Sequence, residues 1–177
     1  MFRLREIEKR DIEVINRWRN DPELIASLGA PYRYINSIVD EKWFDSYMNN
    51  RNTQVRCSIV DENDAIIGLV SLVDIDHMNQ SCVFHIMIGS GENQGKGAGT
   101  YATKEMLNHA FNNLNIHRVE LNVLADNMRA IHLYEKVGFI KEGTRRQCDF
   151  KNGKFVDMLM YSVLREEYLE KIQCSCL

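Results

Sequence analysis

A short glycine-rich segment between a predicted strand and a predicted helix constrains the fold of this chain most strongly. It follows an apolar run that ends at Ile88-Gly89 and opens a long helical pattern. In order, the segment reads Gln94, Gly95, Lys96, Gly97, Ala98, Gly99 and Thr100. Glycine lets backbone N–H groups approach an anion closely, and the first helical turn leaves N–H donors without helical partners. The segment therefore predicts a turn that can hold a pyrophosphate.

This segment differs from two common nucleotide-binding motifs. No Lys-Ser or Lys-Thr pair follows its last glycine, and the dinucleotide fingerprint needs a longer glycine spacing. A kinase-like nucleotide binder would also need a hydroxyl and a carboxylate for magnesium, and the sequence shows neither at a defined position. Because glycine-rich turns also serve as ordinary connections, the segment alone leaves phosphate binding open.

Hydrophobic patterns on both sides of the segment alternate between strand and helix. Strands are predicted at 2–5, 54–60, 66–73, 81–88 and 118–123, followed by a hairpin that turns at Asn152-Gly153. Helices are predicted at 12–18, from Asp21-Pro22, at 37–48, 101–114 and 127–137. The strand at 81–88 is the most apolar, so we expect it to be more buried than its neighbours. The order predicts one mixed α/β domain over residues 1–177, with 165–177 as a short C-terminal tail.

Composition excludes several classes of protein. The 177 residues are 45% hydrophobic and carry a formal net charge of −3, so the chain can bury one core and has no basic surface for nucleic acid. No apolar run is long enough to cross a membrane, and the first residues lack a signal-peptide core, so we expect a cytoplasmic protein. The five cysteines are an odd number without metal-ligand spacing, so no metal site is expected.

A second ordered segment completes a family pattern. It runs from Asn127 through Ala130, Leu133 and Tyr134 to Gly138-Phe139. Together with the glycine-rich segment it resembles the acetyl-CoA-binding core of the GNAT N-acetyltransferases over residues 66–161. The chain looks most similar to the RimL-like and spermidine acetyltransferase branches. This resemblance implies a mixed sheet of about six to seven strands flanked by helices, with a splayed acetyl-CoA cleft.

The resemblance also assigns residues to the cofactor. It implies that backbone N–H groups of Met87, Ile88 and Gly89 meet the pantetheine arm and the acyl oxygen. It places the pyrophosphate on residues 94–100, and it assigns Asn127, Ala130 and Tyr134 to cofactor contact. Asn127 would equally serve as a helix cap.

Acetyl transfer to an amine needs a general acid and a general base. Tyr134 is the candidate acid, because a tyrosine hydroxyl can give a proton to a leaving thiolate; a tyrosine at helical spacing is otherwise a core residue. His85 is the candidate base, because its ordinary pKa near 6.5 suits it to take a proton from an ammonium. Asp74 and Asp76, spaced to project to one side of a strand, are candidates for binding a cationic amine. Deprotonation by bulk solvent also remains open.

The acceptor amine is the least defined part of the site. The spermidine-acetylating branch carries acidic residues where Ser71 and Val83 stand here, which weakens the assignment of a polyamine. The segment from Trp18 to Glu23 looks like RimL-type and nucleotide-aminosugar acetyltransferases, in which this region lines the acceptor site. Trp18 is therefore a candidate for acceptor binding, although core packing would also explain it.

The expected function is direct, acetyl-CoA-dependent N-acetylation of a primary amine: a polyamine, a protein N-terminus or an aminosugar. No cysteine falls in either motif, which disfavours a covalent intermediate. The alternative is a non-catalytic acyl-CoA-binding regulatory module of the same fold. The exposed edge of the last hairpin suggests a homodimer or a larger homo-oligomer.

Overall fold

A seven-stranded mixed sheet forms the centre of the molecule. The computed structural model describes residues 1–89 and 95–175. Within this part of the chain the strand order is β1-β2-β3-β4-β5-β7-β6, with β4 and β5 parallel and the other neighbours antiparallel. The strands are β1 (Arg3–Glu6), β2 (Val55–Val60), β3 (Ile66–Asp76), β4 (Ser81–Ile88), β5 (Arg118–Leu124), β6 (Ile140–Lys151) and β7 (Lys154–Leu164). The predicted mixed α/β sheet is confirmed.

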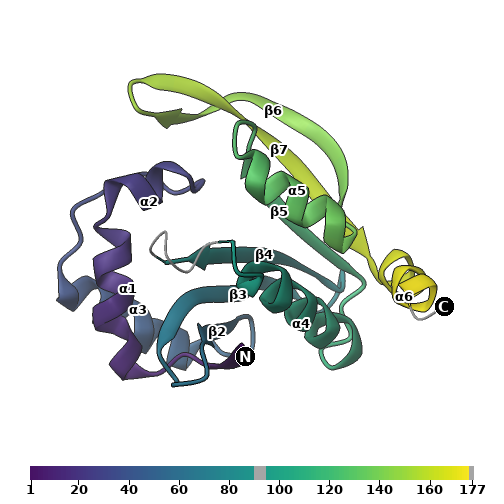
Figure 1. Cartoon of the computed structure of the whole chain (residues 1–177), viewed down its shortest axis with the longest axis horizontal. Helices are drawn as coiled ribbons and strands as arrows, with labels where there is room; N and C mark the ends of the chain where they lie inside the picture. Colours follow the sequence, from purple (N-terminus) through teal and green to yellow (C-terminus); the bar gives the residue numbers. More distant parts are fainter. Residues whose placement is uncertain (90–94, 176–177) are drawn as a thin grey trace.

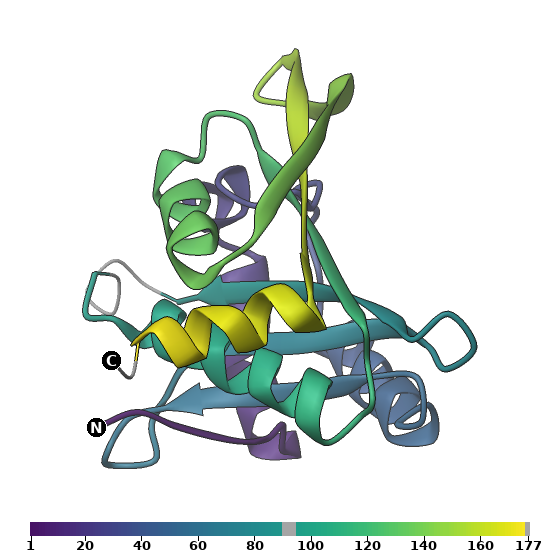
Figure 2. The same cartoon turned by 90° about the vertical axis from the view of Figure 1, so that its right-hand side faces the viewer.

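Helices cover both faces of this sheet (Figure 1). They are α1 (Ile12–Arg19), α2 (Pro22–Ala26), α3 (Ser37–Asn49), α4 (Ala98–Asn112), α5 (Met128–Val137) and α6 (Arg165–Ser175), with a short 3-10 helix, η1 (Lys9–Asp11). Figure 2 shows α6 lying beside α4, where the rings of Tyr168 and Phe111 are 5.1 Å apart. Most of the segment expected to be a tail is therefore a helix.

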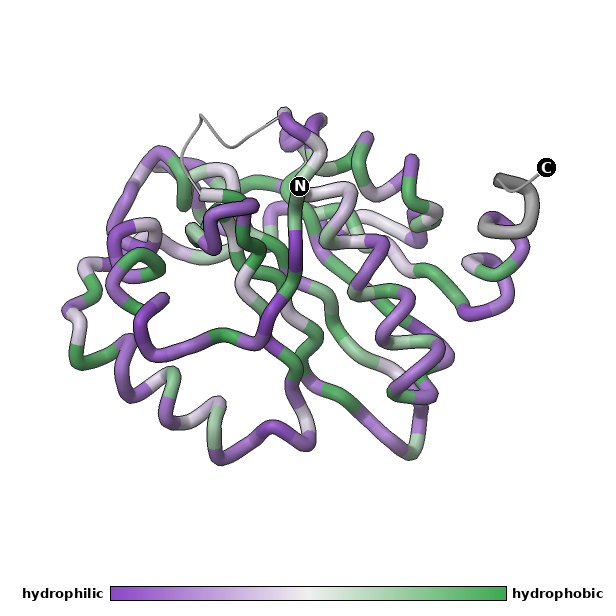
Figure 3. The backbone as a smooth tube through the Cα atoms, turned by 60° about the horizontal axis from the view of Figure 1, so that its bottom comes forward, coloured by the Kyte–Doolittle hydropathy of each residue, from purple (hydrophilic) through white to green (hydrophobic). Residues whose placement is uncertain are grey.

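Two apolar cores lie on the two faces of the sheet. The larger joins β2 to β5 and β7 to α4, α5 and α6, and includes Phe84, Met106, Val119 and Tyr161. The smaller lies under α1 and α3, and is centred on Ile15, Trp18 and Tyr47. Figure 3 shows hydrophobic residues gathered along the central strands, while the helices alternate between hydrophobic and hydrophilic residues. This is the pattern that amphipathic helices on a buried sheet produce.

Local sequence signals explain several boundaries of these elements. Asp21 accepts hydrogen bonds from the backbone N–H groups of Glu23 and Leu24, and Pro22 occupies the first position of α2. At the tip of the last hairpin, Asn152 and Gly153 both have positive φ values, 48° and 80°. Such a two-residue turn favours asparagine followed by glycine.

The sheet splits between β4 and β5. The two strands pair over only three positions, Ser81 with Arg118, Cys82 with Val119 and Val83 with Glu120. Beyond these pairs the strands diverge, and α4 begins beside the opening (Figure 1). The expected splaying of the sheet is confirmed. The expectation that β4 is more buried than its neighbours is wrong: β3 is the more buried strand, because the second half of β4 has no β5 beside it.

Hydrogen bonds join the α2 region, which comes before β2 in the chain, to elements that follow β5. The Lys151 ammonium, at the end of β6, donates to the carbonyl oxygens of Ile25 and Ala30. The side-chain amide of Asn127 donates to the Ser27 carbonyl oxygen at 2.9 Å. The loop after α2 is thereby fixed against the β6–β7 hairpin and the start of α5.

Candidate active site

Every second residue of β4 directs its backbone N–H and C=O groups toward the opening between β4 and β5. The Gly89 N–H donates to the Ile67 carbonyl oxygen of the β3 side at 2.8 Å. Because successive residues of a strand direct their N–H groups to opposite edges, the Ile88 N–H is directed toward the opening, and the Met87 N–H toward β3. The expectation that all three N–H groups face the cofactor is therefore wrong for Gly89 and, by the same alternation, for Met87.

Gly89 has a second role, which is steric. A Cβ atom added to Gly89 would lie 2.4 Å from the Cε2 and Cζ2 atoms of Trp18. The Trp18 indole therefore packs directly on the backbone at the end of β4, and it is only 9% exposed. Trp18 belongs to the smaller core, so the expectation that it binds the acceptor directly is replaced by a packing role.

The Gly89→Ala variant tests this contact. The added methyl group must displace the indole, and overpacking of a filled core costs about 1–3 kcal/mol of unfolding free energy. We expect a lower midpoint of chemical denaturation with an unchanged denaturant slope. The Gly143→Ala variant is a control for the added methyl group, because its backbone does not have a positive φ and a Cβ there would meet only the terminal methyl group of the flexible Met160 side chain. Equal destabilisation of both variants would contradict the steric explanation.

The glycine-rich turn leaves donors open at the start of α4. Gly95 and Gly97 have positive φ values of 82° and 90°. Gly97 is the N-cap and supplies no side chain to the first N–H groups of the helix, while Lys96 is exposed. Those N–H groups and the positive end of the helix dipole suit an anion. The described turn fits a pyrophosphate; Gln94 lies outside the described residues.

Residues 98–100 and Arg129, which the sequence analysis did not name, complete this end of the site. Ala98, the first residue of α4, is buried, and Gly99 and Thr100 are partly exposed in the same turn. The guanidinium of Arg129 lies 3.8 Å from where a Cβ on Gly95 would be. It adds positive charge beside the turn. The sequence contained a signal for it, because Arg129 lies inside the second family segment.

Asn127 and Ala130 act together as a helix cap. The Asn127 side-chain oxygen accepts a hydrogen bond from the Ala130 backbone N–H at 3.1 Å. The same side chain binds Ser27, so both of its polar ends have protein partners. Of the two roles considered for Asn127, the structure shows the cap.

Tyr134 lies beside the point where β4 and β5 separate. Its ring makes edge contacts with Phe84, at 6.3 Å between centroids, and with Phe139, at 5.7 Å. The residue is 7% exposed, and burial raises the pKa of its hydroxyl to about 12. Among the described residues no partner binds this hydroxyl, and Asp149 alone has a fully buried oxygen without a partner, so the Tyr134 oxygen retains contact with solvent. The hydroxyl is therefore protonated at neutral pH and accessible.

His85 is on the other face of β4, toward α1 and α3. It pairs across the strands with Ser71, which pairs with Arg56 on β2. The His85 side chain is exposed, yet surrounding protein lowers its pKa by desolvation, and the positive charge of Arg56 lowers it further while Asp74 opposes the shift. The His85 ring therefore combines an exposed surface with a lowered pKa. At neutral pH it is the unprotonated form, as a base requires.

The two aspartates at the end of β3, Asp74 and Asp76, have different roles. The Asp76 carboxylate accepts hydrogen bonds from the backbone N–H groups of Met78 and Asn79, both at 2.9 Å, so it stabilises a turn. Asp74 has a φ value of 50°, in a region where the register with β4 shifts by one residue. This bulge interrupts the pairing with β4 between Val73 and Asp76, and Ile75 between the two aspartates is buried, so the expectation that both carboxylates bind a cationic amine stays a prediction. Asp74 stays close enough to His85 to act on its charge.

Arg56, a cationic residue that the sequence analysis missed, lies in line with Ser71 and His85 across β2, β3 and β4. The Arg56 guanidinium stacks over Trp43, 5.0 Å from the ring centroid, and Arg19 approaches the same ring at 5.9 Å. The signal was a charged residue within an otherwise apolar strand pattern. We call Arg56, Ser71 and His85 the cross-strand row.

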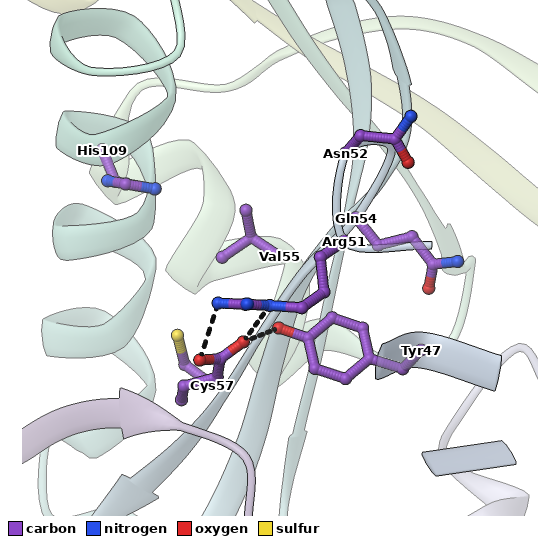
Figure 4. Close-up of a pocket in the computed structure, with 8 residues that line it drawn as sticks. Tyr47, Arg51, Asn52, Gln54, Val55, Cys57 and His109 are labelled. Atoms are coloured by element: carbon purple, nitrogen blue, oxygen red, sulfur yellow. Dashed lines mark hydrogen bonds and ion pairs between the residues drawn. The ribbon is translucent and has the colours of Figure 1, made fainter. Parts of the chain in front are cut away.

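Two open pockets lie away from these residues. One, of about 580 Å³, is beside Arg146 and Asp157 on the β6–β7 hairpin. The other, of about 500 Å³, is lined by residues that include Tyr47, Arg51 and Cys57 (Figure 4). Its one carboxylate, that of Glu6, is already bound by the Tyr47 hydroxyl at 2.6 Å and Arg51 at 2.8 Å. Neither pocket adjoins the split in the sheet.

Two further features are absent from the part of the chain that the structure describes. No three His, Cys, Asp or Glu side chains there lie close enough together to hold a metal ion. None of the helices there is both long and apolar enough to span a membrane.

A split mixed sheet, an open helix N-terminus and a tyrosine beside the split define a class of acyl-CoA-dependent transferases. A model of the acetyltransferase (GNAT) domain matches residues 2–140, and the chain belongs to this family of N-acetyltransferases. It is 30% identical to spermidine N(1)-acetyltransferase of Vibrio cholerae over 169 residues, 95% of each chain. It is 27% identical to the L-amino acid N-acetyltransferase AaaT of Escherichia coli over 157 residues, 87% of this chain and 92% of AaaT. The crystal structure of the Vibrio cholerae enzyme with CoA and spermine superimposes with a TM-score of 0.89 at 30% identity, covering 95% of this chain and 98% of that one.

Proposed function

We propose that this protein transfers an acetyl group from acetyl-CoA directly to a primary amine. The observation that carries the proposal is the position of the Tyr134 hydroxyl, protonated and accessible beside the split between β4 and β5. The open N-terminus of α4 borders the same split. A non-catalytic binding module would have no need of a buried tyrosine that keeps its hydroxyl available.

Different residues would bind acetyl-CoA and transfer protons in this reaction. Acetyl-CoA supplies the activated acyl group as a thioester. The first turn of α4, from Gly97, and Arg129 would hold its phosphates, and the Ile88 N–H is directed toward the opening. His85 takes a proton from the amine nitrogen as that nitrogen bonds to the acyl carbon. Tyr134 donates a proton to the sulfur as the carbon–sulfur bond breaks.

The relatives indicate which acceptors to assay first. Spermidine and L-amino acids are named among them, and one relative from Bacillus subtilis is a putative ribosomal N-acetyltransferase. The first supports a polyamine acceptor. The second is an amine that carries a carboxylate. Ser71 and Val83, which lie on the face of the sheet that carries His85, contribute no negative charge to hold a polycation. Protein N-termini and aminosugars complete the panel.

We also propose self-association in the cytoplasm. β6 is an edge strand, and the exposed rings of Phe150 and Phe155 face each other near its end at 5.2 Å. An open strand edge with exposed aromatic rings is a surface that a second copy would cover.

Thermal denaturation with ligands tests the cofactor assignment. A ligand at 100 times its Kd stabilises the native state by about 2.7 kcal/mol, or roughly 5–10 °C for a chain of this size. We expect this shift with acetyl-CoA and with CoA. ATP, which shares the adenine and phosphates but lacks the pantetheine arm, should give a smaller shift. Stabilisation by ATP alone would exclude the assignment.

A further inference from the structure

Arg56 is a cation without a neutralising partner on the acceptor face of the sheet. Its guanidinium donates to neutral oxygens, Gln54 Oε1 at 2.9 Å and Ser71 Oγ at 3.4 Å. Among the described residues no carboxylate lies within ion-pair distance of it. Six other arginines there do make such pairs: Arg3, Arg5, Arg10, Arg19, Arg51 and Arg118.

The surroundings of Arg56 hold the guanidinium in place without cancelling its charge. Trp43 lies against both Arg19 and Arg56. The charge of Arg19 is neutralised by the buried carboxylate of Asp40, whereas Arg56 is partly buried with only neutral hydrogen-bond partners. Desolvation lowers the pKa of Arg56, Tyr47 and Asp74 only partly oppose this shift, and the charge of Arg19 adds to it. A partly desolvated cation of this kind is stabilised by an anion that enters beside it.

The distance between Arg56 and His85 is short enough for one small molecule to contact both residues. Arg56 and His85 are separated across the sheet by one strand, on which Ser71 pairs with both. Two strand spacings amount to about 10 Å. An amine beside His85 and an anionic group beside Arg56 therefore belong to one compact acceptor, whereas a polycation in this row would be repelled by Arg56.

We propose that the acceptor of this enzyme is an amine that also bears a carboxylate or phosphate group, and that Arg56 binds this anionic group. The proposal rests on the proposed function, because it specifies the substrate of the same site. Arg56 acts as a specificity-determining residue, and its planar guanidinium, stacked on Trp43, presents paired donors to the two oxygens of an anion.

Matched pairs of amines test the proposal in CoA-saturated protein. Cadaverine is compared with lysine for a carboxylate, glucosamine with glucosamine 6-phosphate for a phosphate, and spermidine is added as a polycation. Binding is measured by calorimetry, and acetylation by CoA release in a parallel assay with acetyl-CoA. The variants are Arg56→Gln, Arg56→Lys and, as a control for surface charge, Arg3→Gln, whose side chain is exposed on the edge strand β1 and is paired with Asp64.

We expect the anionic member of at least one pair to bind 10-fold or more tighter than its partner, as a charged hydrogen-bonded contact gives about 10- to 100-fold. Arg56→Gln should remove that preference while the neutral partner binds as before, Arg56→Lys should keep part of it, and Arg3→Gln all of it. Tighter binding of spermidine, no binding of any anionic amine, or equal losses for both members of a pair in Arg56→Gln would overturn the proposal. Binding with this preference but no CoA release would instead refute the proposed function alone.

Discussion

Replacing Tyr134 by phenylalanine should lower kcat by about 10²-fold, the smaller end of the range for loss of a general acid. Phenylalanine keeps the ring contacts with Phe84 and Phe139, so the larger core stays filled. The lost atom is the hydroxyl, which stays protonated at neutral pH because burial raises its pKa to about 12. The measurement is steady-state CoA release at saturating amine, with the Kd of acetyl-CoA determined in parallel.

The structure offers a matched control for this variant. Tyr161 is also buried, but its hydroxyl donates to Glu135 at 2.8 Å and it lies on β7, away from the split. Tyr161→Phe should leave kcat within a few-fold of the parent protein, whatever it does to stability. If both variants lose turnover equally, or Tyr134→Phe keeps full activity on every amine tested, then Tyr134 is not the acid.

Replacing Asp40 by alanine should lower the free energy of unfolding by about 3–5 kcal/mol, the cost of breaking a buried ion pair from one side. The Asp40 carboxylate is 0% exposed on α3, and it accepts from Arg19 and, at 2.6 Å, from Asn16 of α1. Without it, α1 and α3 lose their polar connection and Arg19 loses its counter-charge. Equilibrium denaturation measures the loss, which should also lower Tm by at least about 6 °C.

The neighbouring residue controls for the loss of charge. Glu41 is exposed on the same helix, so Glu41→Ala should change the free energy of unfolding by less than about 0.5 kcal/mol. A similar small change for Asp40→Ala would show that the pair with Arg19 does not contribute to stability.

Much of the architecture was predictable because its signals are local. The limits of β4 follow from one apolar run that ends at Gly89, and the cap at Asn127 follows from a residue type that binds backbone N–H groups. The turn at Asn152-Gly153 depends only on its own two residues. The catalytic assignment of Tyr134 came from a family pattern and stays a prediction.

The remaining features depend on neighbours that are distant in sequence. The burial of β4 was overestimated, because β4 and β5 pair over only three positions and the sequence of β4 alone does not show this. The bulge near Asp74 depends on how β3 meets β4, and the contact of Gly89 with Trp18 joins residues 71 positions apart. Arg56 carries no motif of its own, so only the row across three strands shows that it shares a face with His85.

The narrow junction between β4 and β5 has a consequence for folding. β1 to β4 come from residues 3–88, and β5 to β7 from residues 118–164, so each part of the sheet is built from one continuous stretch of chain. Most strand contacts therefore form within one of two folding units, and three residue pairs join the units inside the sheet. Hydrogen exchange of the amide protons at this junction therefore reports separation of the two units. Exchange of the amide protons in β3 or β7 reports the unfolding of one unit.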